Sequence, residues 1–294
     1  MMRTQVVTGE VGNQLEFKDA LTDSVASGDC HLAMRLDKDG FQFALFDTQS
    51  DQCIFIKSIA KDSEQELDLV KFFEHQLSTH PLLNRDYQSV SLALAGEPAL
   101  AVPSGFSQEE SEKKLLELHL GHTPWQVGEE KIEMAGIRWL FEFPSVLEKA
   151  AKKRFPNVKV STNSAWMIQS ILRKSKWSKG RSVFVDLSDS FFDLYIVNDG
   201  QLEFYNCFSA QNETDVFYHL ANSLHQLGLN AEEEKILISG PIDVGGETMR
   251  LFRKYLKNVD LNFGMDFYKL AKGLGSAKKQ YFVSLLNQFV LCAS

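Results

Sequence analysis

Short apolar or alternating segments occur in the same order in two separate parts of the chain. The first part contains them at residues 32–36, 41–46 and 53–56. The second part contains them at residues 183–185, 192–197 and 202–205. Segments of this length, in which apolar residues alternate with polar ones or form short runs, are typical of β-strands. The pattern therefore predicts three consecutive strands, and it predicts them twice.

Turn and helix signals complete the same unit in both parts of the chain. Tight hairpin turns are predicted where Asp, Asn and Gly gather, at residues 37–40 and 198–200. Helices are predicted from the capping box at residues 63–66 and from about residue 212, and a buried strand follows each, at residues 90–94 and 236–238. Because a strand reached through a helix lies parallel to its neighbour, each half is predicted to hold a mixed five-stranded sheet covered by helices.

An additional segment, residues 98–161, separates the two copies. Its pattern is βαββαβ: a strand at 99–102, a helix opened by the capping box at 107–110, a hairpin of 131–134 with 139–143, a helix opened by the capping box at 145–148, and a closing strand at 158–160. A helix over 162–174 then returns to the first copy. The predicted organisation is a leader segment 1–27, a first domain 28–97 plus 162–176, an inserted subdomain 98–161 and a second domain 180–294.

Composition is that of a globular protein in a reducing compartment. Hydrophobic residues make up 44% and charged residues 24% of the 294 residues, and no low-complexity tract interrupts them. The four cysteines form no CxxC pair, which is typical of reduced thiols. The first residues lack the features of a signal peptide, and no apolar run approaches about 18 residues. We therefore expect a cytoplasmic protein without membrane insertion.

Positive charge is concentrated in one stretch of an acidic chain. Residues 148–181 hold ten basic residues and one acidic residue, whereas the whole chain has a net charge of −8. The basic residues are Lys149, Lys152, Lys153, Arg154, Lys159, Arg173, Lys174, Lys176, Lys179 and Arg181. Two interpretations remain open: a solvated helix face followed by a charged linker, or a site in segment 149–181 for an anionic partner such as RNA or DNA.

The duplicated βββαβα unit with its βαββαβ insertion resembles the α/β fold of the actin-like ATPase superfamily, a ribonuclease H-like fold. Within that superfamily the chain resembles the branch of the division protein FtsA, the pilus-assembly protein PilM and the cytoplasmic domain of GspL. Residues 185–200 resemble the second phosphate loop of that branch, and residues 236–241 resemble its adenosine motif. The chain also resembles an uncharacterised bacterial family that has this fold and no assigned activity.

The resemblance identifies positions that would contact ATP and magnesium in such a fold. They are Asp37, Lys38 and Gly40 in the first loop, Asp186, Ser188, Ser190 and Asp193 in the second, and Gly240 in the adenosine motif. Backbone N–H groups approach phosphate closely where glycine is present. Here Ser188, Asp189 and Ser190 replace those glycines, and the added carboxylate of Asp189 would repel phosphate. In the alternative interpretation these acids cap strand ends or turns, Lys38 is a hairpin tip and Gly240 is an ordinary turn.

Three functions follow from these alternatives. We favour a pseudo-ATPase: a non-catalytic actin-like scaffold that binds another protein, with no catalytic residues, no protein-bound metal and no cofactor. The second is an ATP-binding switch that uses magnesium and hydrolyses weakly or not at all. The third is an anion-binding or nucleic-acid-binding adaptor that uses segment 149–181. The apolar stripe of the last helix, residues 281–290, is expected to lie in the core, and a homo-oligomer remains open.

Overall fold

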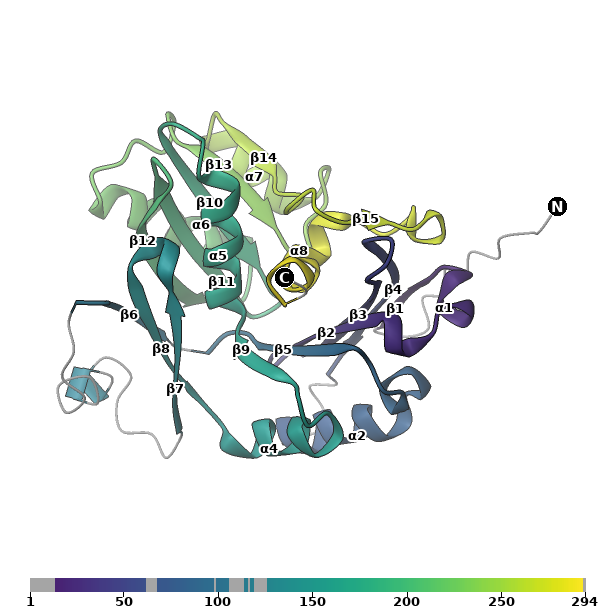
Figure 1. Ribbon diagram of the computed structural model, residues 1–294. Helices are drawn as coiled ribbons and strands as arrows, with labels where there is room; N and C mark the ends of the chain where they lie inside the picture. Colours follow the sequence, from purple (N-terminus) through teal and green to yellow (C-terminus); the bar gives the residue numbers. More distant parts are fainter. Residues whose placement is uncertain are drawn as a thin grey trace. The chain divides into compact units, whose positions relative to one another are not determined.

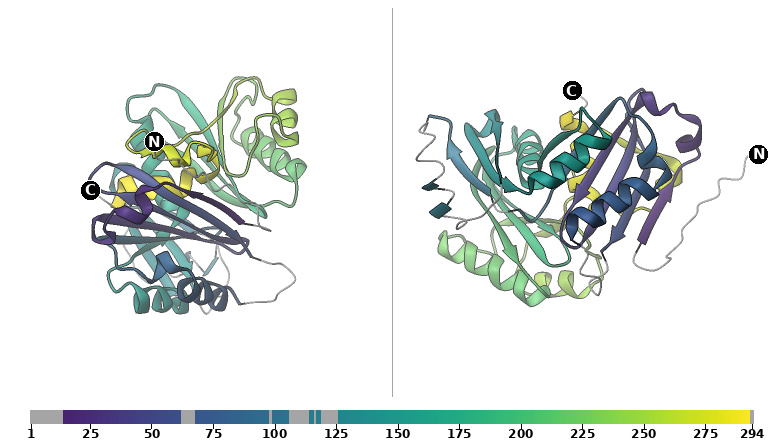
Figure 2. Two further views of the ribbon diagram at one scale, coloured as in Figure 1. Left: turned by 90° about the vertical axis from the view of Figure 1, so that its right-hand side faces the viewer. Right: turned by 90° about the horizontal axis from the view of Figure 1, so that it is seen from below.

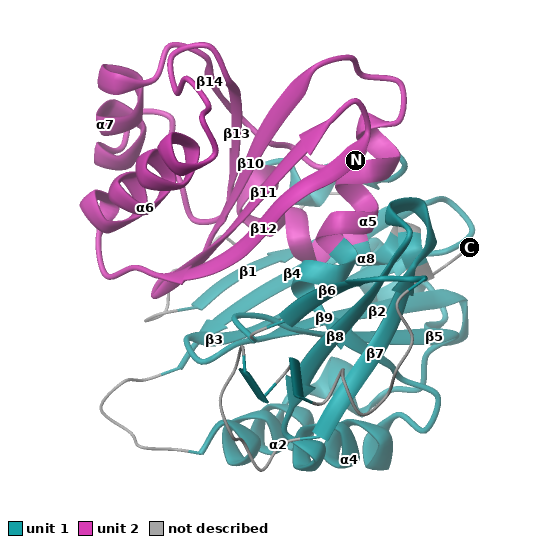
Figure 3. Ribbon diagram, turned by 90° about the vertical axis from the view of Figure 1, so that its left-hand side faces the viewer, with its two compact units in different colours: residues 1–166, 266–277, 288–294 teal, residues 167–265, 278–287 magenta. Residues whose placement is uncertain are grey.

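The computed structural model describes residues 14–61, 68–97, 99–105, 114–115, 117–118 and 126–292 (Figure 1). The chain divides into two compact units (Figure 3). Unit 1 comprises residues 1–166, 266–277 and 288–294, and unit 2 comprises residues 167–265 and 278–287. Each unit contains one large mixed sheet, and unit 1 also contains a smaller antiparallel sheet; each unit is described by itself.

The sheet of unit 1 has seven strands, β1 (Gln14–Lys18), β2 (Cys30–Leu36), β3 (Gly40–Asp47), β4 (Gln52–Ala60), β5 (Ser89–Leu94), β9 (Lys159–Thr162) and β15 (Lys269–Leu270). Their order is β1-β4-β3-β2-β5-β9, and β15 pairs with β4. Strands β2, β3 and β4 run antiparallel, whereas β2, β5 and β9 run parallel. Seven successive residues of β2 are buried, as expected for a strand in the centre of a sheet covered on both faces.

The sheet of unit 2 has five strands, β10 (Arg181–Leu187), β11 (Phe191–Asn198), β12 (Gln201–Ser209), β13 (Lys235–Ser239) and β14 (Val259–Leu261). Their order is β12-β11-β10-β13-β14. The first three strands run antiparallel, and β10, β13 and β14 run parallel. The same order and directions occur in β4-β3-β2-β5-β9 of unit 1. The predicted duplication is therefore confirmed.

Helices follow the strands in both units. Unit 1 contains α1 (Leu21–Ser24), α2 (Leu69–Thr79), α4 (Ser145–Arg154) and the short 3-10 helices η1 (Ser27–Asp29), η2 (Pro81–Asn84), η3 (Glu133–Ala135) and η4 (Lys272–Leu274). Unit 2 contains α6 (Glu213–Gln226), α7 (Glu247–Tyr255) and η5 (Lys279–Phe282). Helices α5 (Asn163–Ser175) and α8 (Val283–Cys292) contribute residues to both units. In unit 1, α2 and α4 lie side by side along the sheet (Figure 2).

Apolar burial accounts for the placement of these helices. In unit 2, inward side chains of β10, β11 and β13 pack against α6 and α7, with Leu220 and Phe252 fully buried. The stripe of the last helix is buried as predicted, since Leu285, Leu286 and Phe289 are all covered. Phe289 stacks on Phe46 of β3 with ring centroids 4.5 Å apart. The extended apolar contact provides the main favourable free energy of folding.

The inserted segment forms a three-stranded antiparallel sheet of β6 (Ala99–Pro103), β8 (Ile137–Phe143) and β7 (Gln126–Ile132), in the order β6-β8-β7. The structure differs from the sequence prediction in one strand. The strand expected at 158–160 to close this insertion is present as β9, but it pairs with β5 in the larger sheet. By pairing there, β9 satisfies backbone groups that would otherwise be exposed on the edge of β5.

Helix starts were predicted less well than strands. The capping boxes at 63–66 and 107–110 lie outside the described residues, but residues 114–115 and 117–118, where the second box predicted a helix, are helical. Helix α2 begins at Leu69, where the Asp68 side chain accepts a hydrogen bond from the Val70 N–H. Helix α4 begins at Ser145, but its N-cap is Pro144 and no side chain caps it. Within the described part of the chain, no helix has the length and apolar character required to span a bilayer.

Candidate functional site

The first predicted loop is the turn between β2 and β3, and its carboxylate is engaged within the turn. Asp37 is only 4% exposed. Its Oδ1 accepts hydrogen bonds from the backbone N–H groups of Asp39 and Gly40, both at 2.8 Å. Its Oδ2 lies 2.5 Å from Nη1 of Arg35, a buried side chain two residues earlier on β2. Asp37 therefore closes the turn and forms a buried ion pair.

Burial and charge act in opposite directions on Asp37. Desolvation raises the pKa of its carboxyl group, and Arg35 partly offsets this effect. Gly40 is required for a steric reason, because a Cβ at that position would lie 2.5 Å from the backbone oxygen of Ile59 on β4. Lys38 is exposed at the tip of the turn. The glycine that the sequence assigned to phosphate contact therefore permits close packing of two strands.

The second set of predicted residues lies at the carboxyl end of β10. Asp186 and Asp193 are directly opposite each other on β10 and β11, and Ser239 on β13 lies opposite Asp186 on its other side. Asp186 is 4% exposed and Asp193 is 2% exposed. The Ser239 hydroxyl donates to Asp186 Oδ1 at 2.7 Å, and the Tyr205 hydroxyl donates to Asp193 Oδ1 at 2.9 Å. The two acids are thus neighbours, and each accepts a hydrogen bond from a neutral hydroxyl group.

A buried tyrosine lies beside these acids. The Tyr195 hydroxyl, on β11, has no hydrogen-bond partner among the described residues. Burial, reinforced by the nearby charge of Asp193, raises the pKa of this hydroxyl group. The sheet face that carries Asp186 and Asp193 is therefore more polar than the opposite face, which packs against α6 and α7.

The turn that follows β10 is closed by backbone hydrogen bonds. The Ser188 N–H donates to the Phe191 carbonyl oxygen at 2.9 Å, and the Ser190 carbonyl oxygen accepts from the Ala210 N–H at 3.1 Å. Ser188 and Ser190 are half-buried, and Asp189 between them is exposed. The polypeptide thus makes a tight hairpin turn here without the glycines that the resemblance requires.

Gly240 ends β13 in a conformation that requires glycine. Its φ is +101°, and a Cβ there would lie 2.2 Å from the Leu187 carbonyl oxygen. Its N–H donates to the Gln280 carbonyl oxygen at 2.8 Å. In the loop that follows, Asp243 accepts hydrogen bonds from Lys278 and, at 2.7 Å, from the Tyr281 hydroxyl. The hydrogen bond from Lys278 lowers the pKa of Asp243.

The structure thus collects the predicted residues into two groups. Asp37, Lys38 and Gly40 share one turn of unit 1. The remaining five lie on the ends of β10, β11 and β13 and the turn between β10 and β11 of unit 2. Sequence reasoning missed the partners of the acids, namely Arg35, Ser239 and Tyr205. Arg35 could have been found, since alternation places residues i and i+2 of a strand on one face.

No cluster of His, Cys, Asp and Glu suited to a metal ion occurs in the described ranges.

A family model described as a protein of unknown function, DUF3822, matches residues 20–259. The match covers most of the chain, which therefore belongs to this family. A search of curated proteins by sequence finds no match.

Solved structures show the fold. A Bacteroides thetaiotaomicron protein with an actin-like ATPase fold and unknown function is 20% identical, over 80% of this chain and 91% of that chain, with a TM-score of 0.70. The PilM–PilN type IV pilus biogenesis complex contains a chain that is 8% identical, over 89% of this chain and 98% of that chain, with a TM-score of 0.61. The chain therefore has the actin-like ATPase fold that its duplicated pattern predicted.

Proposed function

We propose that this member of the DUF3822 family is a non-catalytic actin-like protein that acts by binding another protein. The observation that carries the proposal is the engagement of Asp37. In the first loop this carboxylate closes the turn through two backbone N–H groups and pairs with Arg35. A hydrated magnesium ion would have to compete with these contacts, and breaking a buried ion pair costs about 3–5 kcal/mol.

The second loop supports the same conclusion. Ser188, Asp189 and Ser190 occupy the positions where glycine would let the backbone approach phosphate, and Asp189 adds negative charge. Catalysis of phosphoryl transfer needs several positioned groups simultaneously. A chain that has lost the glycines of one loop and uses the acid of the other for its own turn lacks that set.

Protein binding is proposed because the architecture is intact while the loops have changed. The PilM–PilN complex is a precedent for a protein of this fold assembled with another protein. A folded scaffold retains such a role without nucleotide chemistry.

The test is the effect of nucleotide on purified full-length protein. We expect no rise in melting temperature with millimolar ATP and magnesium, because a ligand that binds only the native state must raise it. We also expect no phosphate release above that of an Asp186→Ala variant. ATP turnover that disappears in the variant would overturn the proposal.

The second candidate is an ATP-binding switch, and one observation favours it. Asp186 and Asp193 lie side by side on adjacent strands, both buried. Paired carboxylates are the oxygen ligands that magnesium prefers, directly or through water. In this case ATP with magnesium would raise the melting temperature without turnover, and Asp193→Asn would abolish the rise while Ser58→Ala in unit 1 would not. Equal shifts in both variants would exclude a nucleotide held at Asp193.

A further inference from the structure

The turn between α5 and β10 presents a tryptophan to solvent. Trp177 is 86% exposed, more than any other large hydrophobic side chain of the described residues. By contrast, Trp139 and Trp166 are fully buried. Burying a large apolar side chain stabilises a folded protein, so exposing this one forgoes that stabilisation. Tryptophan is enriched at interfaces because its ring is apolar and its indole N–H is polar, so the exposed Trp177 is a candidate contact for a partner.

Hydrogen bonds hold this turn against the neighbouring β11–β12 hairpin. The Ser178 N–H donates to the Ser175 carbonyl oxygen at 2.9 Å, which closes the turn. The Gly180 N–H donates to Asp199 Oδ1 at 2.8 Å, and the Asp199 N–H donates back to the Gly180 carbonyl oxygen at 3.2 Å. Asp199 belongs to the tight turn that joins β11 and β12. Residues 175–180, which we name the Trp177 turn, are therefore held in place by hydrogen bonds at both ends.

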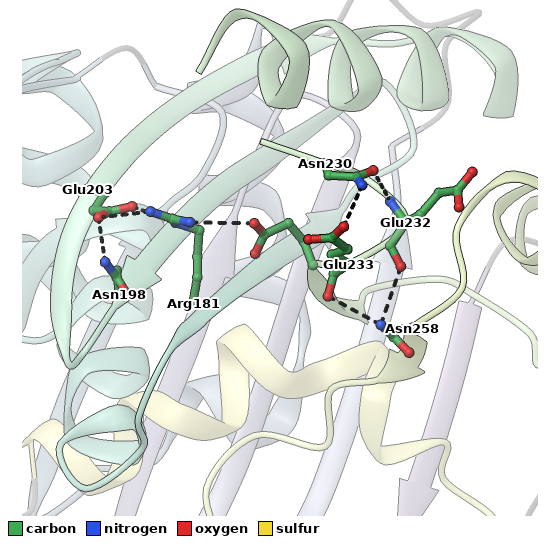
Figure 4. Close-up of polar contacts among 8 residues, drawn as sticks. Arg181, Asn198, Glu203, Asn230, Glu232, Glu233 and Asn258 are labelled. Carbon is green, nitrogen blue, oxygen red and sulfur yellow. Dashed lines mark hydrogen bonds and ion pairs between the residues drawn. The ribbon is translucent and has the colours of Figure 1, made fainter. Parts of the chain in front are cut away.

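The Trp177 turn lies in the most basic part of unit 2. Residues 173–181 contain five basic residues and no acidic residue. Lys174 and Arg181 of this stretch are engaged within the unit. Lys174 donates to the Gly264 carbonyl oxygen at 2.9 Å. Arg181 pairs with Glu203 (Figure 4) and also with Glu234.

The two lysines of the turn itself remain exposed beside the tryptophan. Lys176 and Lys179 lie one residue before and two residues after Trp177, and both are solvent-exposed. The Nζ of Lys176 lies 5.3 Å from the centroid of the Trp177 ring. The polar network in Figure 4 joins Arg181, Asn198 and Glu203 and so links the start of β10, which follows the turn, to β11 and β12. The Trp177 turn therefore combines an amphipathic ring with two nearby cationic groups.

We propose that the Trp177 turn is a contact for an anionic phospholipid surface, independent of the pseudo-ATPase proposal. Indole rings concentrate at the boundary between headgroups and acyl chains. Each Lys or Arg near an anionic membrane surface adds electrostatic attraction to that surface. Contacts of this size give reversible surface attachment and not insertion. A single aromatic ring does not form the series of stacking platforms that single-stranded nucleic acids use.

The test is binding of the full-length protein to phosphatidylcholine vesicles with and without phosphatidylserine. We expect co-sedimentation with the anionic vesicles only, accompanied by a blue shift of tryptophan emission that is absent in Trp177→Phe. Trp177→Ala and the pair Lys176→Glu with Lys179→Glu should each weaken binding at least about tenfold, because the first variant removes the interfacial ring and the second replaces attraction to the surface by repulsion. The matched control is Lys149→Glu with Lys153→Glu on α4, which changes net charge equally and should retain binding.

Three outcomes would overturn the proposal. The first is equal binding to neutral and anionic vesicles, and the second is equal loss in the α4 control. The third is binding of a single-stranded RNA oligonucleotide, lost on Trp177→Ala, without binding to either vesicle. That third result would assign the turn to nucleic acid instead. The melting temperature of each variant, measured in parallel, separates a lost contact from a lost fold.

Discussion

The two units have the same sheet topology but place opposite charges at equivalent positions. The pairing registers align the end of β2 with the end of β10. At the penultimate position of the strand, unit 1 has a base and unit 2 has an acid. The aligned trio of residues on three adjacent strands is Arg35, Gln42 and Ala93 in unit 1 and Asp186, Asp193 and Ser239 in unit 2.

This difference shows which features of the repeated unit the fold requires. Apolar alternation is retained in both units, because it determines which side chains are buried. The charge at the strand end is not retained, because in each unit a nearby side chain of that unit compensates it. In unit 1 the buried Arg35 pairs with Asp37 in the turn. In unit 2 the buried Asp186 accepts from the Ser239 hydroxyl, and the turn position equivalent to Asp37 is Ser188.

The largest effect should come from removing the acid of the first turn. We expect Asp37→Ala to lower the free energy of unfolding by about 3–5 kcal/mol, because it leaves Arg35 buried without its carboxylate and removes the acceptor of two backbone N–H groups. The equivalent change in unit 2, Ser188→Ala, should cost less than about 1 kcal/mol, since it removes no buried charge. Urea denaturation of both variants measures the difference.

A third variant sharpens this comparison. Asp37→Asn retains an oxygen that can accept from the Asp39 and Gly40 N–H groups but removes the charge that pairs with Arg35. Its stability should lie between those of the wild type and Asp37→Ala. Equal stability of the Ala and Asn variants would show that the ion pair alone, and not closure of the turn, accounts for the loss.

The apolar pattern predicted the repeated strands because the burial of a strand determines the hydrophobicity of consecutive residues in the sequence. Segments 32–36 and 183–185 correspond to β2 and β10, and the strands after the helices to β5 and β13. The short strand β1 was not predicted, because its register opposite β4 is set by residues far along the chain. Among the hydrogen-bond partners of the site, Ser239 was missed for the same reason. Ser239 lies 53 residues from Asp186, and local pattern contains no information about such pairs.

A smaller loss in the free energy of unfolding is expected on acidification, and we expect it to arise from His31 in unit 1. His31 is buried on β2, with Nδ1 2.8 Å from the Ser89 hydroxyl and Nε2 3.0 Å from the Ser91 hydroxyl. Burial lowers its pKa from 6.5 to about 3. Below pH 6.5 the unfolded chain therefore binds a proton at His31 that the folded protein excludes. The contribution of neutral His31 to the free energy of unfolding is complete above pH 6.5 and is lost as the pH falls towards 3. The equivalent position in unit 2 is Ser182, which does not titrate.

The measurement is the free energy of unfolding at pH 7 and pH 5. We expect the wild type to lose about 2 kcal/mol from His31 between these values. His31→Gln, which retains hydrogen-bonding groups for both serines, should be less stable at pH 7 but should lose about 2 kcal/mol less on acidification. His80, whose pKa is lowered to about 4, adds a contribution of the same sign in both proteins. An unchanged pH dependence in the variant would show that His31 is not the source.

The smallest expected loss of stability comes from removing the Tyr205 hydroxyl group, which donates to Asp193. Tyr205→Phe removes the 2.9 Å hydrogen bond to Asp193 and should cost about 1.5 kcal/mol, the lower end for a bond to a charged acceptor. In unit 1 the residue aligned with Asp193 is Gln42. Its side chain donates to the Ser58 hydroxyl at 3.4 Å, which is a long hydrogen bond between neutral groups. Ser58→Ala should therefore cost less than about 0.5 kcal/mol. Equal losses in the two variants would show that Asp193 is not held as a charged acceptor, and the contrast between the two units would then be confined to Arg35 and Asp186.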